Sequence, residues 1–383
     1  MFIYLYNMLF STIPGQDEVK QNLVQMVANN RLSHALLFLG KEGSGALQLA
    51  KALAQYIVCE HKKEDSCGSC ASCKKASGMI HPDIHFSFPT ISRNSGDKPV
   101  CNDFIEEWRI FNTEMPYGNA FDWLQSIEAE NKQGNITAHE CEDIIRKLNL
   151  KSFESGYKIL IQWMPEYLGT SGNKLLKLIE EPPEKTLFIL VAEDESKIIP
   201  TILSRTQLIK INRLKTADIQ SWLIEQKQVP KEKAALIAPL AQGNLREALH
   251  LLHHGDEDWQ ELLREWLNAI LKNGPVAQVK WVDEMSKLGR EKQKQFISYF
   301  IHLLSVSVYI SNNEIPDDVA ENEIDFAQRL IKLAGTSQIQ AIVEELDKSI
   351  YYIERNANPK MLFMALSIKF YHIIKDKSVI LVN

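Results

Sequence analysis

The sequence has few of the features that direct a chain to a membrane or to nucleic acid. None of its apolar runs approaches the roughly 20 residues that a membrane-spanning helix needs. Lys and Arg number 43 against 49 Asp and Glu, so the net charge is −6 and no overall basic field marks a nucleic-acid-binding protein. The opening MFIYLYN has no charged n-region and no small-residue cleavage site, and Met8 is a candidate start. We therefore expect a cytoplasmic protein whose contacts with DNA, if any, are shared with partners.

Cysteine is also scarce, but it is concentrated. Four of the six cysteines fall within fifteen positions, in the pattern C-x7-C-x2-C-x2-C, whereas Cys101 and Cys141 look like ordinary residues. Without an export signal, such crowding favours metal over disulfides. A thioredoxin-like redox pair explains only two of the four, and His61 is an alternative ligand. We expect one closed tetrahedral Zn²⁺ site in a module spanning 59–73, held by Cys59, Cys67, Cys70 and Cys73.

Apolar runs alternate with helical patterns from residue 14 to about residue 211. This alternation predicts crossover units and a parallel sheet that is buried on both faces. Thr137 and Glu140 form a capping-box pattern at the start of one of the helices. The periodicity is lost between His85 and Gly134, and we interpret residues 86–134 as an insertion of short helices on the domain surface, of unknown role.

After Lys215 the pattern is helical throughout. Residues 216–225, 231–240 and 244–253 predict a compact helical unit, and longer amphipathic helices follow to residue 375. Aromatic residues at helical spacing, such as Trp266 and Phe296, predict buried core faces. We therefore expect three domains, at residues 1–212, 213–256 and 257–383.

The segment HALLFLGKEGSGALQLAKALAQ, residues 34–55, begins like a phosphate-binding loop between a strand and a helix. A working loop needs a Lys to neutralise phosphate oxygens and a Ser or Thr to hold Mg²⁺. Here the glycines remain, at Gly40, Gly43 and Gly45, but Ala46 and Leu47 occupy the Lys and Ser/Thr positions. We interpret the segment as a tight strand-to-helix turn.

A longer motif is more specific. Residues 172–211, GNKLLKLIEEPPEKTLFILVAEDESKIIPTILSRTQLIKI, contain a helix pattern stopped by Pro182 and Pro183, a buried strand and a short helix opened by Pro200. This stretch resembles the signature of bacterial clamp-loader ATPases, the gamma/tau and delta prime subunits of DNA polymerase III. The resemblance extends to residues 11–40, to HPD at 81–83, to GNLREAL at 243–249 and to NANPKMLF at 356–363. It implies an AAA+ type α/β P-loop domain with a zinc module, a small helical lid domain and an all-helical collar domain.

The resemblance also shows what has been lost. The positions of the two acids that place Mg²⁺ and water carry Gln162 and Trp163, and the phosphate-sensing position carries Ala192 or Glu193. Together with the loop lysine and hydroxyl, five groups that hydrolysis requires are absent. We expect that ATP is not hydrolysed at this chain's own site.

The motif keeps Ser204 and Arg205, with Thr206 in place of the usual Cys. In the family this arginine reaches the ATP of a neighbouring subunit and stabilises charge on the γ-phosphate. The alternative is a helix-end cation paired with a local carboxylate. Arg246 in GNLREAL matches a second sensor arginine, to which we assign a structural salt bridge.

The resemblance therefore implies a delta-prime-like, non-hydrolysing subunit that offers Arg205 in trans. Its expected partners are the gamma/tau and delta subunits, the sliding clamp and, through the assembled complex, primer-template DNA. It would be part of the DNA polymerase III holoenzyme, and no membrane is involved. An active gamma/tau-like ATPase and a DNA-associated adaptor on the same fold are the alternatives, and partner identity discriminates between them.

Overall fold

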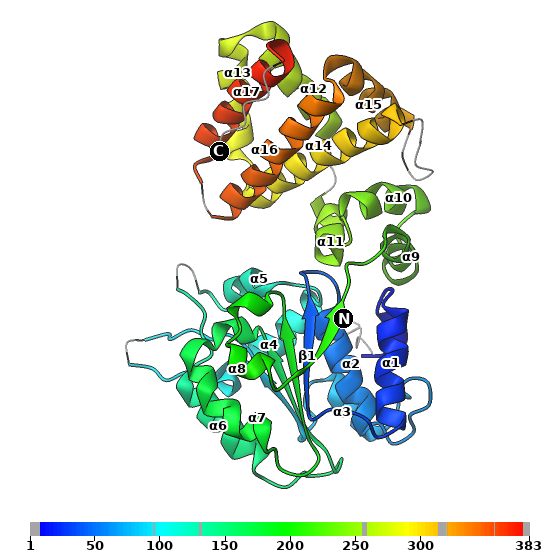
Figure 1. Cartoon of the computed structure of the whole chain (residues 1–383), viewed down its shortest axis with the longest axis vertical. Helices are drawn as coiled ribbons and strands as arrows, with labels where there is room; N and C mark the ends of the chain where they lie inside the picture. The colour runs from blue at the N-terminus through cyan, green and yellow to red at the C-terminus, as the bar shows by residue number, and fades with distance from the viewer. Residues whose placement is uncertain are drawn as a thin grey trace. The chain divides into compact units, whose positions relative to one another are not determined.

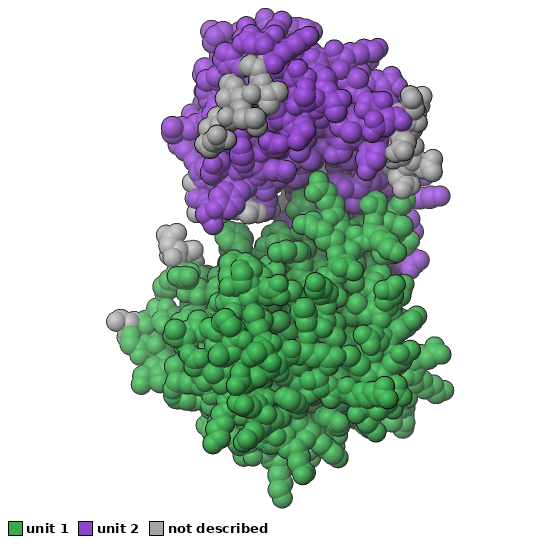
Figure 2. Space-filling model, in the orientation of Figure 1, with its two compact units in different colours: residues 1–222, 242–247 green, residues 223–241, 248–383 purple. Residues whose placement is uncertain are grey.

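We describe a computed structural model of the chain, which covers residues 8–94, 96–129, 132–254, 259–312, 319, 321–355 and 357–377. The opening segment MFIYLYN, the predicted domain boundary at 256–257 and Asn356 of the NANPKMLF motif lie outside these residues. The contacts divide the chain into two units, residues 1–222 with 242–247 and residues 223–241 with 248–383 (Figure 2). The division into three domains stays a prediction.

Unit 1 contains a five-stranded parallel sheet in the order β2-β3-β4-β1-β5 (Figure 1). The strands are β1 (Ala35–Gly40), β2 (Ile84–Ser87), β3 (Lys158–Trp163), β4 (Thr186–Ala192) and β5 (Gln207–Ile211). Strand β2 was not anticipated: it is only four residues long and ends inside the segment that we interpreted as an insertion. The parallel sheet that the alternating pattern predicted is confirmed.

Helices cover both faces of this sheet. They are α1 (Asp17–Ala28), α2 (Ala46–Val58), α3 (Ala71–Ser77), α4 (Ile105–Glu114), α5 (Ala120–Ser126), α6 (Ala138–Leu148), α7 (Leu176–Glu180) and α8 (Pro200–Leu203). Alternate strand residues serve different layers: Leu36 and Phe38 pack with α2 and α4, whereas Ala35 and Leu37 pack with α6 and α7. Helix α7 is shorter than predicted, because residues 169–175 form a 3₁₀ segment before it.

Two expectations about residues 86–140 need correction. The insertion does not lie on the domain surface, because Trp108 and Trp123 are fully buried and belong to the main core. Phe88 stacks on Trp108 at 4.3 Å between ring centroids, and burial of such large rings adds hydrophobic area to the core. Thr137 does cap α6, but the capping box is incomplete, since the Glu140 carboxylate accepts the backbone N–H of Cys101 instead.

The rest of the described chain is helical, as predicted. The helices are α9 (Thr216–Lys227), α10 (Lys231–Leu240), α11 (Leu245–His254), α12 (Trp259–Asn268), α13 (Pro275–Lys287), α14 (Arg290–Ser311), α15 (Glu321–Leu333), α16 (Thr336–Glu354) and α17 (Pro359–Lys375). Unit 2 has its own core, in which Trp266 stacks on Trp281 and contacts Phe296. The predicted core faces are confirmed. Across the residues described, no helix combines the length and apolarity needed to span a bilayer.

Candidate functional site: a degenerate nucleotide loop and an exposed arginine

The glycine-rich loop connects β1 to α2. Gly43 and Gly45 adopt left-handed backbone angles, with φ of +69° and +88°. A Cβ atom on Gly43 would lie 1.9 Å from Oδ1 of Asn244, so a side chain is excluded at that position. Ala46 and Leu47 are buried in the main core. The loop is therefore a strand-to-helix joint, and the two positions that should carry the chemistry serve packing.

The space that the loop encloses is small. A cavity of about 30 Å³ lies among residues 40–48, 116–118, 163–164 and 191–193. This volume holds one or two waters, whereas small-molecule sites occupy roughly 300–1,000 Å³. A larger hollow of about 870 Å³ shares Lys41, Met164 and Glu193 with it, but Gly40, Gly43 and Gly45 do not line that hollow. Trp163 is directed into the aromatic core, 5.2 Å from Trp108, and Gln162 is buried against Ser87. Neither position can hold a metal ion as an acid would.

The carboxylate of Glu42, in the middle of the loop, is bound by three side chains from two other segments. It accepts hydrogen bonds from Asn119 at 2.8 Å and Asn244 at 3.1 Å, and it pairs with Arg246 at 3.3 Å. Arg246 is 3% exposed and also binds both oxygens of Asp122, at 2.5 and 2.6 Å. The predicted salt bridge of Arg246 is thus present, with two acids. No pattern in the sequence points to Asp122 as a partner of Arg246, because the two residues are 124 positions apart.

A second group of carboxyls follows the ends of β3 and β4. Glu166 accepts the backbone N–H groups of Glu193 and Asp194, at 2.7 and 2.9 Å. Burial, and to a smaller extent the nearby carboxylates of Glu42 and Glu166, raise the pKa of Glu193 to about 8 against the opposing effect of Lys41. The carboxyl groups of Glu42 and Glu193 therefore line the loop cavity where a nucleotide would bring its phosphates, and neither offers the positive charge that a phosphate needs.

The four clustered cysteines converge as predicted. The Sγ atoms of Cys59, Cys67, Cys70 and Cys73 all lie within 4.8 Å of one another. Tetrahedral Zn²⁺ with Zn–S bonds of about 2.3 Å needs sulfurs about 3.8 Å apart, and the Cys67 and Cys73 sulfurs are 3.9 Å apart. Backbone N–H groups of Cys67, Cys70 and Cys73 point at cysteine sulfurs, an arrangement that stabilises thiolates. The residues fit a closed structural metal site, and His61 is exposed and outside the group.

Ser204 and Arg205 lie between α8 and β5, at the amino ends of the strands. We call the carboxyl ends of the strands, where the glycine-rich loop lies, the loop edge of the sheet, and the amino ends the exposed edge. Leu36 pairs with Gln207 and Gly40 with Ile211, so Arg205 lies about six residues, roughly 20 Å, from the loop along the strand direction. An arginine side chain spans less than half of this distance. The Arg205 side chain is 32% exposed, donates to the Thr201 carbonyl at 3.0 Å, and pairs at 3.3 Å with Glu180, whose side chain is 58% exposed. Arg205 therefore cannot serve its own chain's loop.

Comparisons with known proteins agree with this geometry. The model of a family described as DNA polymerase III, delta subunit, matches residues 15–215, which is more than half of the chain. The chain belongs to this family. Among its relatives is the DNA polymerase III subunit delta' of Bacillus subtilis, 26% identical over 336 residues that cover 86% of this chain and 89% of the relative. The subunit delta' of Yersinia pestis is also 26% identical, with 87% of each chain covered.

A further relative in this clamp-loader family differs in length. The DNA polymerase III subunit tau of Bacillus subtilis is 28% identical over 290 residues, 74% of this chain but only 44% of the relative. The chain thus spans less than half the length of that subunit. A solved gamma-subunit-related protein of Thermotoga maritima is 16% identical, with a TM-score of 0.39 over 91% of this chain and 98% of the solved one.

Proposed function

We propose that the chain is a delta-prime-like clamp-loader subunit that does not hydrolyse ATP itself. It works in the cytoplasm and supplies Arg205 in trans to the ATP site of a neighbouring gamma/tau subunit. With the delta subunit it takes part in loading the sliding clamp on primer-template DNA. The zinc module supports the α/β domain, residues 213–256 act as the lid domain, and residues 257–383 form the collar through which the subunits assemble.

The observation that carries this proposal is the position of Arg205. A partly exposed guanidinium at the edge opposite the chain's own loop can act on a phosphate only if another subunit brings it. The loop edge supports the same conclusion, since Glu42, Arg246 and Asp122 satisfy one another there and the cavity holds only one or two waters. The delta' relatives match this chain along most of their length, whereas the tau relative does not.

The decisive experiment replaces Arg205 in the reconstituted complex. Arg205→Ala should leave assembly intact and lower the clamp- and DNA-stimulated ATPase rate, by about a thousandfold at the one site that it serves. The loss for the whole complex is smaller when other sites keep their own arginines. Arg205→Lys should rescue poorly, because an ammonium keeps the charge but lacks the planar fork that grips two oxygens. A wild-type ATPase and clamp-loading rate in an assembled Arg205→Ala complex would refute the trans role.

The alternatives have their own outcomes. Metal-dependent ATP turnover by the purified chain, abolished by a mutation in residues 40–47, would identify an active gamma/tau-like ATPase. Failure to co-purify with gamma/tau and delta subunits would favour a DNA-associated adaptor on the same fold.

A further inference from the structure

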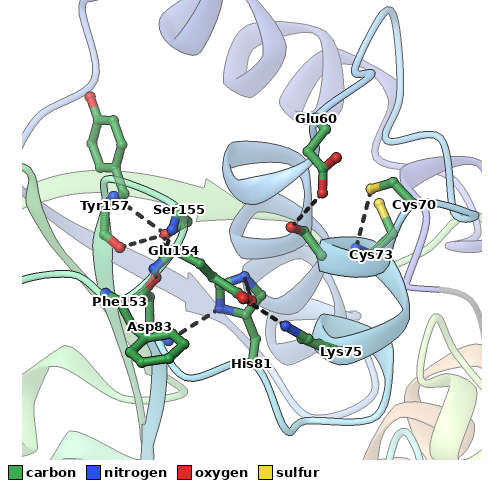
Figure 3. Close-up of polar contacts among 11 residues, drawn as sticks. Glu60, Cys70, Cys73, Lys75, His81, Asp83, Phe153, Glu154, Ser155 and Tyr157 are labelled. Carbon is green, nitrogen blue, oxygen red and sulfur yellow. Dashed lines mark hydrogen bonds and ion pairs between the residues drawn. The ribbon is translucent and has the colours of Figure 1, made fainter.

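Asp83, which directly precedes β2, fixes the loop between α6 and β3, residues 149–157 (Figure 3). Asp83 is 2% exposed, and its carboxylate accepts the backbone N–H groups of Phe153, Glu154 and Ser155. Burial alone would raise the pKa of Asp83, but these N–H groups outweigh it and the pKa lies below its ordinary value. The ionised carboxylate therefore stabilises this loop conformation, in which Phe153 is 80% exposed.

The side chain of Glu154 connects this loop to α3. One carboxylate oxygen lies 2.6 Å from Nζ of Lys75 on α3, and the other lies 3.3 Å from Nε2 of His81. The His81 ring is buried, and its Nδ1 accepts the backbone N–H of Asp83. Burial lowers the pKa of His81, so the ring is neutral at pH 7. Lys75 therefore supplies the positive charge beside Glu154, and contacts run without a gap from α3 to Asp83.

Helix α3 in turn depends on the clustered cysteines. It has only seven residues, Ala71–Ser77, and an isolated helix of fewer than about 12 residues is marginal in water. The sulfur of Cys70 caps the first turn by accepting the backbone N–H of Cys73, which is fully buried. Both sulfurs belong to the group of four that fits a metal ion. Because a structural metal ion and the fold around it form together, the position of Lys75 depends on the metal.

We propose that zinc binding at the four cysteines is coupled to the conformation of the 149–157 loop, through Lys75 on α3 and Glu154 on the loop. With the metal bound, Lys75 pairs with Glu154 and the loop stays on Asp83. Without the metal, α3 unfolds, Glu154 loses its charged partner and the loop opens more often. This inference rests on the zinc module of the proposed function, and it adds a regulation of the α/β domain by metal occupancy.

The competing explanation is a surface ion pair without consequence for the loop. The Lys75 and Glu154 side chains are 40% and 27% exposed, which limits the effect of their pairing to about fivefold. Glu154 is held in two other ways, however: buried His81 lies beside its second oxygen, and Asp83 accepts its backbone N–H. A change at the Glu154 side chain is therefore passed to the backbone that Asp83 binds. Coupling is reciprocal, so a loosened loop must weaken zinc binding by the same factor.

Hydrogen exchange of the full chain, with and without a zinc chelator, tests the coupling. Chelation should raise the exchange rates of the Phe153, Glu154 and Ser155 backbone N–H groups about fivefold, while those of β4 stay unchanged. Lys75→Met should raise them by the same factor with zinc bound, and chelation should then add nothing. Lys74→Met removes the same charge from an exposed position on α3, and this matched control should respond to chelation as the wild type does.

Zinc affinity, measured by competition with a chromogenic chelator, provides the reciprocal test. Glu154→Gln should weaken zinc binding about fivefold, although Glu154 is not one of the four cysteine ligands. A direct electrostatic influence has the opposite sign: zinc with four thiolates carries net negative charge, so removal of a nearby carboxylate would strengthen binding. Glu142→Gln, which breaks an ion pair with Lys174, is the control and should leave zinc affinity unchanged.

Three results would overturn this inference. The first is loop exchange that does not respond to chelation in the wild type, or that rises equally in β4. The second is an equal response to chelation in the Lys75→Met and wild-type chains. The third is a zinc affinity of Glu154→Gln that equals or exceeds that of the wild type. If zinc binds and one of these results is found, only the coupling is wrong; if the chain binds no zinc, the proposed metal site fails with it.

Discussion

Charged side chains differ in burial and pairing between the loop edge and the exposed edge of the parallel sheet. At the edge after β1, Glu42, Arg246 and Asp122 are paired with one another, and the arginine and Asp122 are buried. At the edge before β5, Arg205 is partly exposed and its one acidic contact, Glu180, is more exposed still. At the loop edge the charged groups pair with one another. At the exposed edge the Arg205 side chain, and on another loop that of Phe153, are accessible to solvent.

The glycine-rich loop can therefore serve the fold although its residues no longer suit nucleotide hydrolysis. A Cβ atom at position 43 would clash with Asn244, so Gly43 is required by the fold, and Ala46 and Leu47 fill the core. Those constraints belong to the fold and are independent of nucleotide. Arg205 does not fill the core in this way; its contacts are with Thr201, Ser204 and Glu180, and under the proposed function it acts on another subunit.

The largest effect is expected from removal of the metal ion that we expect at Cys59, Cys67, Cys70 and Cys73. We expect about one Zn²⁺ per chain, because structural zinc contributes on the order of 10–16 kcal/mol to the folding of such modules. Cys70→Ser or a strong chelator should abolish it and expose residues 59–80 to protease. Metal analysis and limited proteolysis measure both outcomes.

Cys141→Ala is the matched control, since Cys141 is buried on α6 outside the cluster. It should keep the metal. Zinc content that is unchanged by Cys70→Ser, or lost equally in the control, would contradict the four-cysteine site. If chelation also weakened the ion pairs of Arg246 with Glu42 and Asp122, the stability of the loop edge would depend on the metal site.

Arg246→Ala should cost about 3–5 kcal/mol of unfolding free energy, because Asp122 would remain as a buried carboxylate without its cation. Arg246→Lys should recover part of this, since one ammonium cannot bind both Asp122 oxygens as the guanidinium does. Denaturant unfolding at pH 7 provides the measurement. A cost below about 1 kcal/mol would mean that the loop edge is not held by this network.

Glu193 gives the loop edge a pH dependence. Its pKa is raised from 4.5 to about 8, so between these values the folded state holds a proton that the unfolded state has released. Stability from this group is therefore present below about pH 4.5 and is lost as pH rises through 8. Glu193→Gln should stabilise the protein at pH 9, by on the order of 1–2 kcal/mol, and change little at pH 4.

Urea unfolding at both pH values tests this, with Asp194→Asn as the control. The pKa of Asp194 is lowered by hydrogen bonds from Ser196, so its neutralisation should bring no gain at high pH. Equal effects of Glu193→Gln at pH 4 and pH 9 would show that the pKa of Glu193 is the same in the folded and unfolded protein.

Much of the fold could be predicted because it depends on local pattern. The strands around Leu36 and Ile189 are continuous apolar runs between helical periods, and the cysteine spacing predicted four side chains that the structure brings together. The insertion could not be predicted, because Trp108 and Trp123 are too far apart in sequence to show a period, and only the fold brings them beside β3. Distance in sequence likewise hid the Asp122–Arg246 pair, whose members are 124 positions apart.

The candidate site shows the same division. The absence of acids at Gln162 and Trp163 could be seen by counting along a motif. That Glu42 would be bound by Asn119, Asn244 and Arg246 depended on two distant segments converging on one loop. The exposure of Phe153 and the buried Asp83 behind it also required the structure, because the sequence near them shows only a short polar turn.

The smallest effect concerns the stability of the exposed edge, and it discriminates between the two roles of Arg205. Because Arg205 and Glu180 are 32% and 58% exposed and 3.3 Å apart, solvent screens their attraction, and each single neutralisation should cost less than about 1 kcal/mol. A double-mutant cycle with Arg205→Ala and Glu180→Gln should therefore give a coupling energy near the detection limit. In the assembled complex the two variants should diverge: Arg205→Ala lowers the stimulated ATPase rate, whereas Glu180→Gln leaves it unchanged or raises it by releasing the guanidinium. If both variants lower that rate equally and their stability coupling exceeds about 2 kcal/mol, Arg205 acts through its local ion pair, and the contrast between the two edges disappears.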